Sequence, residues 1–234
     1  MSDEARELSD EEAAELRARL VERRDAALAH VVKFGDPVLR SRASEVEAFD
    51  EQLAAEVARM VAIMSEGMGV GLAATQLGAL RRLLVFQAGP DAPPRAIVNP
   101  ALEWLSDESE VAEEGCLSLP QVTVDVERPL HARVSGRDET GEEILLEASG
   151  LEARVLQHEI DHLDGVLILD RTSRDQRKGA LRALREGPSY HPPGSERDEG
   201  EGENPDGEDD EGAGQDPPTE RRGLGRLRRS SAAA

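Results

Sequence analysis

Two histidines stand four residues apart in the stretch QHEIDHLDG, a spacing that could hold one metal ion. On a helix, residues i and i+4 project from one face and lie about 6 Å apart along the axis. His158 and His162 also continue a stripe that begins with the apolar Leu151 and Val155, so we expect both imidazoles to point inward. Glu159 lies about 100° around the helix from His158, where it can reach a water beside the ion rather than the ion itself. The stretch therefore predicts a metal site with Glu159 as its acid and base, against the alternative of an ordinary helix with two histidines.

The single cysteine of the chain stands in the stretch EEGCLSLP. A lone cysteine is usually a small buried hydrophobe. The two histidines, however, need a third ligand, and no histidine follows them before the expected end of the fold near Gly187, since His191 lies beyond it. A Cys-His-His set leaves one position open for water, which is typical of a catalytic metal site. We therefore predict that Cys116, His158 and His162 are the ligands.

A third stretch, GVGLAATQLG, is rich in small residues. Gly69, Gly71 and Ala74 superficially match the dinucleotide fingerprint, which requires a strand before it. A helix is expected before this stretch instead, so we reject a nucleotide site. The remaining interpretation is a tight loop whose backbone can pair with an extended peptide, with Gln76 offering an amide. The alternative is a packed turn of small residues.

The elements that must position these residues follow from periodicity and from capping signals. Ser9 with Glu12, and Ser149 with Glu152, fit the capping box that opens a helix. We expect helices over 1–28, from Asp50 to Glu66, from Ser149 to Leu163, and from Ser173 onward. We expect strands at Leu83–Gln87, Ala96–Asn99 and Val122–Glu127, and a hairpin of His131–Gly136 with Glu143–Glu147.

Composition divides the chain of 234 residues into three parts. We expect a helical extension over 1–28, one folded domain over 29–187, and a disordered acidic tail over 188–234 that ends in an Arg-rich segment. The net charge of −21 argues against DNA binding by the whole protein. One cysteine cannot form an internal disulfide, and no apolar run approaches the roughly 18 residues of a membrane span. The acidic N-terminus does not look like an export signal, so we expect a cytoplasmic protein.

Together and in this order, the stretches GVGLAATQ, EGCLS and HEIDH resemble the peptide deformylase family. The resemblance includes FGDPVLR near the start and covers roughly residues 30–185. It implies an α+β fold, in which small mixed or antiparallel sheets wrap around a central helix that carries the HExxH motif. It also implies removal of the formyl group from N-formyl-methionine at the N-terminus of newly synthesised proteins.

The resemblance also assigns roles by position. Gln76 and the backbone N–H of Leu117 would form the oxyanion hole. The backbones of Val70, Gly71 and Gly115 would line the peptide groove, and the side chains of Ala112, Leu151 and Val155 would line the methionine pocket. Many bacterial members carry an arginine where this chain has Thr123, so contacts at the groove rim depart from the family pattern.

The chemistry needs one divalent ion, and the sulfur–nitrogen–nitrogen ligand set admits Fe(II), Zn(II), Ni(II) or Co(II). The resemblance implies Fe(II). A water activated by the ion would attack the formyl carbon, while Glu159 takes the proton and passes it to the leaving amine. The expected partners are N-formyl-methionyl nascent peptides, and the basic helix after Ser173 could also dock on the ribosome.

Two other functions remain open from the sequence. A zinc endopeptidase also uses H-E-x-x-H, although its usual third ligand is a downstream His or Glu. A non-catalytic module bound to the ribosome is the second alternative. The presence of Glu159 and Gln76 argues against that module, because a protein without catalysis does not need them.

Overall fold

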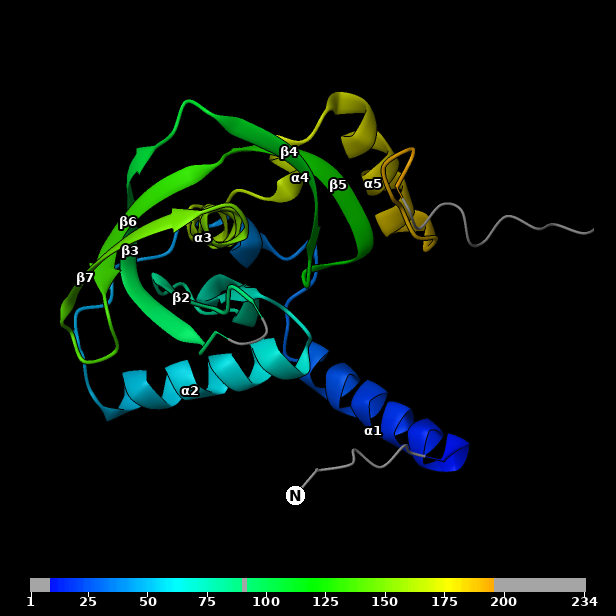
Figure 1. The fold of residues 1–234 in the computed structure, drawn as a ribbon, viewed down its shortest axis with the longest axis horizontal. Helices are drawn as coiled ribbons and strands as arrows, with labels where there is room; N and C mark the ends of the chain where they lie inside the picture. The colour runs from blue at the N-terminus through cyan, green and yellow to red at the C-terminus, as the bar shows by residue number, and fades with distance from the viewer. Residues whose placement is uncertain (1–8, 90–91, 196–234) are drawn as a thin grey trace, which may run out of the picture. The chain divides into compact units, whose positions relative to one another are not determined.

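The fold is organised around one helix, α3 (Leu151–Leu163), which carries the H-E-x-x-H stretch. The computed structural model describes residues 9–89 and 92–195. Figure 1 shows α3 nearly end-on, with strands curving around it on two sides. Ten of its thirteen residues are buried, because the helix has neighbours on almost every face. The predicted α+β class, with sheets wrapped around this helix, is confirmed.

Two antiparallel sheets surround α3. The first has five strands in the order β1-β2-β3-β6-β7, and the second is the hairpin β4-β5. The strands are β1 (Gly71–Ala73), β2 (Leu83–Phe86), β3 (Arg95–Leu105), β4 (Ser109–Cys116), β5 (Leu119–Pro129), β6 (His131–Arg137) and β7 (Glu143–Ser149). The predicted β6-β7 hairpin is confirmed, with His131 opposite Ser149 and Arg137 opposite Glu143. β1 and β4 were not predicted.

Six further helices complete the described part of the fold. They are α1 (Asp10–Leu28), η1 (Pro37–Arg40), α2 (Glu51–Glu66), η2 (Ala74–Leu77), α4 (Ile168–Arg171) and α5 (Arg174–Glu186). The capping box of Ser9 and Glu12 opens α1 as predicted. Asp50 caps α2, whose Leu53, Met60 and Met64 are buried against the first sheet. Among the described residues, no helix combines the length and apolar character that a membrane span requires.

The start of α3 differs from the prediction that Ser149 caps it. Ser149 is the last residue of β7, and its hydroxyl lies 2.8 Å from Nδ1 of His131 on the neighbouring strand. Gly150 occupies the N-cap position with a φ of 57°. The strand thus turns into the helix within one residue, which requires a backbone conformation that favours glycine. Because the Ser149 hydroxyl bonds to His131 across the sheet, it is not available to cap the helix.

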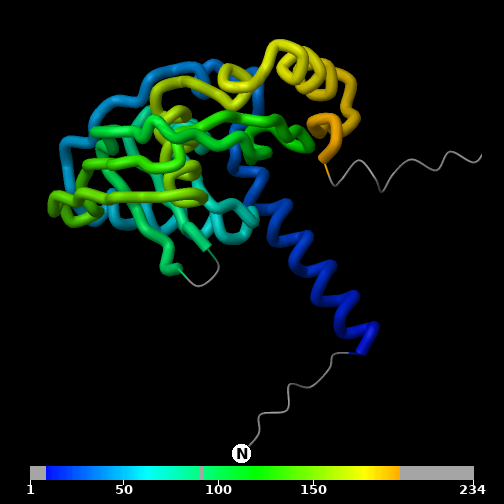
Figure 2. The backbone as a smooth tube through the Cα atoms, turned by 45° about the horizontal axis from the view of Figure 1, so that its top comes forward, coloured from blue at the N-terminus to red at the C-terminus, as the bar shows by residue number. Residues whose placement is uncertain are grey.

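The α1 helix extends away from the rest of the fold over most of its length (Figure 2). Near its C-terminal end, Ala27 is buried in a core cluster and Arg23 forms a 2.8 Å ion pair with Glu66 of α2. Leu16 and Leu20 are about half exposed. The described part of the extension is therefore helical and largely solvated.

The C-terminal end of the domain lies further along the chain than predicted. Residues 188–195 are described, and Tyr190 forms a parallel bridge with Val122 of β5. This bridge gives the segment backbone partners that its composition alone does not indicate. The boundary at Gly187 is therefore too early. The rest of the predicted disordered tail, residues 196–234, lies outside the described residues.

We predict that Gly165→Ala, just beyond α3, destabilises the fold strongly. Gly165 has a φ of +75°, and an added Cβ would lie 2.7 Å from the Arg40 carbonyl oxygen. Strain and overlap together are expected to cost about 3 kcal/mol. Gly187→Ala is the matched control, since Gly187 also follows a helix with positive φ but has nothing within 4 Å of its Cβ position. It should cost only about 1 kcal/mol. Urea unfolding of both variants measures the difference, and equal losses would contradict the close packing at Gly165.

Candidate active site

Three side chains from two distant segments converge beside α3. Cys116 Sγ lies 3.2 Å from His162 Nε2, and the possible ligand atoms of Cys116, His158 and His162 all lie within 4.8 Å of one another. The two imidazole rings meet edge to face at a centroid distance of 5.0 Å. The predicted ligand set is therefore brought together, and it is the only such group of three found among the described residues.

Each ligand occupies a place that its element fixes. His158 and His162 lie one helical turn apart on α3, which places both rings on the same face. Cys116 ends β4, where the pairing with β5 becomes irregular after Gly115. The irregularity frees the Cys116 backbone from the regular ladder. The thiol can then turn toward the helix.

A buried carboxylate, Glu114, links the cysteine strand to the histidine helix. Its Oε2 lies 3.0 Å from His158 Nδ1, so the other ring nitrogen, Nε2, is left for a metal. Its Oε1 accepts hydrogen bonds from Arg128 and Arg154, each at 2.7 Å. Burial alone would raise the pKa of Glu114, but the bonds from His158 and Arg128 lower it to about 2. Glu114 is therefore ionised at neutral pH.

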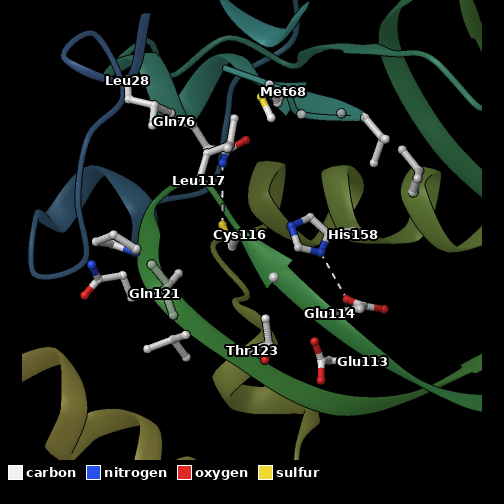
Figure 3. Close-up of a pocket in the computed structure, with 18 of the residues that line it drawn as sticks. Leu28, Met68, Gln76, Glu113, Glu114, Cys116, Leu117, Gln121, Thr123 and His158 are labelled. Carbon is white, nitrogen blue, oxygen red and sulfur yellow. Dashed lines mark hydrogen bonds and ion pairs between the residues drawn. The ribbon is translucent and has the colours of Figure 1, made fainter. Parts of the chain in front are cut away.

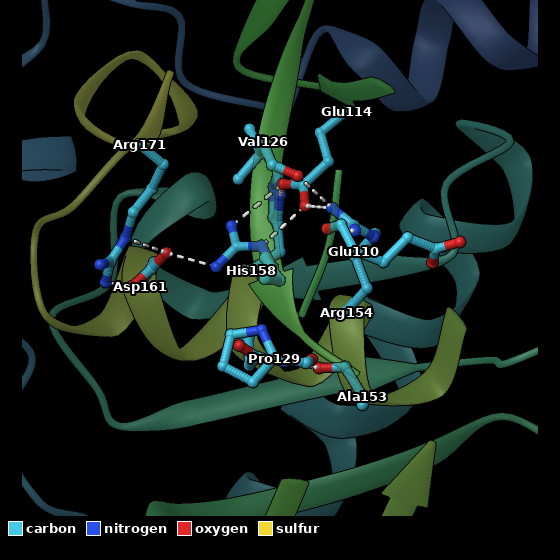
Figure 4. A network of polar contacts seen from close by, with 11 residues as sticks. Glu110, Glu114, Val126, Pro129, Ala153, Arg154, His158, Asp161 and Arg171 are labelled. Atoms are coloured by element: carbon cyan, nitrogen blue, oxygen red, sulfur yellow. Dashed lines mark hydrogen bonds and ion pairs between the residues drawn. The ribbon is translucent and has the colours of Figure 1, made fainter. Parts of the chain in front are cut away.

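The contacts of Glu114 continue to the surface through a chain of charges (Figure 4). Arg128 bonds to Asp161 of α3 at 2.8 Å, and Asp161 in turn pairs with Arg171 of α4 at 2.6 Å. Arg128 and Arg154 both extend into the protein interior, where an unpaired charge would be costly. Every member of this chain of charges therefore has a partner of opposite charge.

The electrostatics of the ligand set favour a bound cation. Burial would raise the pKa of the Cys116 thiol, yet His162 and His158 hold it well below its usual range. Burial would lower the pKa of His158, yet its bonds with Cys116 and Glu114 hold it well above its usual range. Surroundings that stabilise a thiolate and an extra positive charge at this point also suit a divalent ion. The donor set and its charge therefore fit the predicted metal.

Glu159 lies beside the ligands but has no partner of its own. It is almost fully buried, and its Oε2 has no hydrogen bond among the described residues. Burial is the main cause that raises its pKa. Gly71 of β1 passes so close that any side chain there would overlap with the Glu159 carboxyl group. A buried carboxyl group whose Oε2 has no hydrogen bond and whose pKa is raised is suited to proton transfer.

Gln76 is oriented toward the same point. Its Oε1 accepts a hydrogen bond of 2.9 Å from the Ala73 amide, and this bond determines which end of the side-chain amide faces the site. Its Nε2 lies 3.6 Å from Cys116 Sγ and 3.3 Å from Ser118 Oγ. Figure 3 shows Gln76 above Cys116, joined to it by a dashed line, with His158 on the other side of Cys116. An N–H donor is therefore positioned beside the ligand set.

The site opens into a cavity of about 830 Å³. Its lining includes most of the residues predicted to contact the substrate, namely Val70, Gly71, Gln76, Gly115, Leu117, Leu151 and Val155. Ala112 is half-buried on β4 and is not among the described residues that line this cavity, so its place in a methionine pocket stays a prediction. Leu151 and Val155 give one side of the cavity an apolar surface.

Some residues of the site were not predicted from the sequence. Glu114 was seen only as half of a Glu pair before the cysteine. The signal that could have singled it out is physical, because a histidine ligand usually donates its second ring N–H to a carboxylate or carbonyl. His191 and Ser189 also line the cavity, although their segment was predicted to be disordered. No sequence pattern indicated this.

The ligand set also bears on the endopeptidase alternative. That interpretation expected a third ligand downstream of the H-E-x-x-H helix. Cys116, which is upstream, completes the set instead, and no acidic or histidine residue downstream of α3 joins it among the described residues.

Comparisons with known proteins agree with this geometry. The family model described as polypeptide deformylase matches residues 28–178. The chain is similar to peptide deformylase 1 of Corynebacterium efficiens, with 47% identity over 154 residues that cover 65% of this chain and 91% of the relative. It is also similar to the peptide deformylase of Acidothermus cellulolyticus, with 46% identity over 153 residues that cover 65% and 83% of the two chains.

Solved structures show the same fold. The crystal structure of peptide deformylase from Thermotoga maritima is 47% identical, with a TM-score of 0.59, and the match covers 61% of this chain and 96% of that one. The peptide deformylase from Synechococcus elongatus, solved in complex with actinonin, is 40% identical with a TM-score of 0.64, covering 68% and 88% of the two chains. With the family model matching more than half of its length and a Cys-His-His ligand set in place, the chain belongs to the peptide deformylase family and is a metallohydrolase.

Proposed function

We propose that this deformylase removes the formyl group from N-formyl-methionine at the N-terminus of newly synthesised peptides. The observation that carries the proposal is the unpartnered carboxyl group of Glu159, buried beside the set of Cys116, His158 and His162. Hydrolysis of a formamide needs a proton acceptor for the attacking water and a proton donor for the leaving amine. One carboxyl group with a raised pKa can serve in both steps.

The residues divide the work as follows. Cys116, His158 and His162 hold one divalent ion, which when bound supplies a Lewis acid that polarises the formyl carbonyl and acidifies water. Glu159 accepts the proton of the attacking water and delivers it to the amine nitrogen. Gln76 donates through Nε2 to the developing oxyanion, aided by the backbone N–H of Leu117. Each such donor is worth about 10²–10³ in rate.

The identity of the ion is part of the proposal. A thiolate with two imidazoles suits Fe(II), Zn(II), Ni(II) or Co(II), and we propose Fe(II) as the native ion. A thiolate transfers more charge to the ion than an imidazole does, so water is acidified less than at a site with three histidines. This makes the assistance of Glu159 more important.

Substrate recognition follows from the walls of the cavity. We propose that the peptide extends along the backbones of Val70, Gly71 and Gly115, whose small or absent side chains leave the main chain accessible. The methionine side chain then packs against Leu151 and Val155, which border the cavity.

We also propose that the protein works in the cytoplasm, where formylated nascent peptides appear, and that the basic face of α5 docks on the ribosome. Ala180 and Ala183 of α5 are buried, while Arg174, Lys178 and Arg185 are exposed on its other side. Exposed cations on an acidic protein suit a surface of phosphates.

The roles of ligand and acid/base can be separated by metal content. We predict that Cys116→Ala loses metal and activity together, because two histidines are too few for tight binding. Glu159→Ala should keep the metal yet lose about 10²–10⁴ in kcat, since it removes the proton carrier only. Metal analysis beside steady-state kinetics checks both variants. Glu152→Ala, on the same helix, is the control and should change neither quantity. A metal-free Glu159→Ala, or an active, metal-loaded Cys116→Ala, would overturn the assignment.

A preference for methionine is the second prediction. Burying the flexible thioether chain against Leu151 and Val155 should favour formyl-Met-Ala over formyl-Gly-Ala by about 1.5–3 kcal/mol, or roughly 10- to 150-fold in kcat/KM. Val155→Asp should reduce this ratio because the pocket becomes polar. Rates on the two peptides are measured side by side, and equal values for the wild-type protein would refute an apolar methionine pocket.

Ribosome docking predicts a salt-dependent interaction. Changing Arg174, Lys178 and Arg185 together to Ala should weaken co-sedimentation with ribosomes and flatten its salt dependence, because three phosphate contacts are lost. A variant with Arg17, Arg19 and Arg59 changed to Ala has the same net charge and should bind as the wild type does. Binding that is absent, insensitive to salt, or equally weakened in both variants would remove the proposal.

A further inference from the structure

The segment that follows α5 returns to the active-site cavity and is fixed there by backbone hydrogen bonds. The Tyr190 amide donates to the Gln121 carbonyl at 2.9 Å, and the Tyr190 carbonyl accepts from the Thr123 amide at 2.9 Å. These bonds form an isolated parallel bridge between Tyr190 and Val122 of β5. The segment lies beyond residues 28–178, the part that the family model matches.

The Tyr190 side chain anchors the segment on α5. Its ring lies against Gly179, where an added Cβ would be 2.9 Å from the ring carbon Cζ. Tyr190 also packs with the core cluster shared by β5 and α5. A glycine in the middle of a helix is otherwise unfavourable by roughly 1 kcal/mol relative to alanine. The contact with the Tyr190 ring explains why a glycine stands at this position. The position of the segment is thus determined by packing as well as by hydrogen bonds.

Side chains alternate in direction along an extended backbone, so the side chains of the two residues that flank Tyr190 point away from its ring. Ser189 and His191 both line the cavity, whereas Tyr190 does not belong to its lining. His191 Nδ1 lies 2.8 Å from the Thr123 hydroxyl. Thr123 is itself paired with Gly115 across the β4-β5 hairpin. Gly115 of β4, Thr123 of β5 and His191 of the bridged segment therefore form one row on the face that the cavity exposes.

We propose that Ser189 and His191 form a subsite for substrate residues downstream of the formyl-methionine, with His191 as the residue that determines specificity there. The proposal rests on the deformylase activity and on a peptide that runs along Gly115. Because Gly115 has no side chain, a downstream side chain of the peptide can lie over the row and reach the imidazole. The hydrogen bond through Nδ1 holds the ring and leaves Nε2 for the peptide.

The side chains around this proposed subsite favour polar residues in the substrate. These side chains are an imidazole, two hydroxyl groups from Ser189 and Thr123, and the nearby carboxylate of Glu113, which also lines the cavity. A substrate hydroxyl or amide can bond to Nε2 of His191, whereas an aliphatic side chain would leave these groups without partners. We therefore expect tripeptides with a polar third residue to be favoured over those with an aliphatic one.

The test compares peptides of different length and polarity with the metal-loaded, full-length protein. Substrates are formyl-Met-Ala, formyl-Met-Ala-Ser and formyl-Met-Ala-Val, and the measured quantity is the ratio of kcat/KM between each tripeptide and the dipeptide. His191→Ala should reduce this ratio for the Ser peptide by about tenfold, the worth of roughly one hydrogen bond. The loss should appear mainly in KM. The ratio for the Val peptide should change little.

Two further variants make the outcome specific. Tyr190→Ala removes the anchor and should lower the Ser-peptide ratio as His191→Ala does. His131→Ala is the control, because His131 bonds to Ser149 within the five-stranded sheet and does not line the cavity. If His191→Ala lowered kcat/KM equally on all three peptides, the role of His191 would be merely structural and the subsite would be overturned. An unchanged ratio of kcat/KM between the Ser tripeptide and the dipeptide would also overturn it. A wild-type protein that turns over none of the peptides would instead contradict the deformylase function.

A binding measurement keeps the proposal testable even if these variants fold poorly. The imidazole resonance of His191 in the wild-type protein is followed by NMR during titration with the product peptides Met-Ala and Met-Ala-Ser. Contact predicts a shift with Met-Ala-Ser that is at least several times larger than with Met-Ala. Identical small shifts with both peptides would contradict contact between His191 and the downstream residue.

Discussion

The hydrogen bond between the buried carboxylate of Glu114 and His158 is the interaction on which the site depends. Glu114 lies on β4 two residues before Cys116, and it bonds across to His158 on α3 at 3.0 Å. The ligands come from segments more than forty residues apart, so no local structure can set the distance between them. Glu114 sets it by bonding to the helix from the cysteine strand itself. The same bond determines which nitrogen of His158 faces the ion.

Glu114 could not be buried alone. Removing an ionised carboxylate from water costs several kcal/mol unless charged hydrogen bonds replace the lost solvation. Arg128 and Arg154 provide them, and Arg128 also bonds to Asp161 on the next turn of α3. These contacts tie β4, β5 and α3 into one unit. Such a network contributes less to overall stability than an apolar core would, but it holds the catalytic elements in a single arrangement.

The sequence predicted the parts of the fold that have local signals. The histidine pair, the helix that carries it and the β6-β7 hairpin follow from spacing and turn residues. β4 was missed because its exposed, acid-rich residues show no clear apolar alternation, even though it carries Cys116. Ser149 was misjudged as a cap because its alternative partner, His131, becomes a neighbour only when β6 and β7 pair. The segment at Tyr190 depends on Gly179 and β5, and that contact too exists only in the folded chain.

Two carboxylates near the ligand set show how environment, and not residue type, assigns a role. Glu114 accepts bonds from a histidine and two arginines, and its pKa falls to about 2 despite burial. Glu159 is equally buried but unpartnered, and burial raises its pKa. The first therefore remains an anion that orients a ligand, while the raised pKa of the second suits it to accept and release a proton. Gly71 makes this possible, because any larger residue at position 71 would occupy the space of the Glu159 carboxyl group. The first residue of β1 thus leaves the space that the carboxyl group of the acid/base needs.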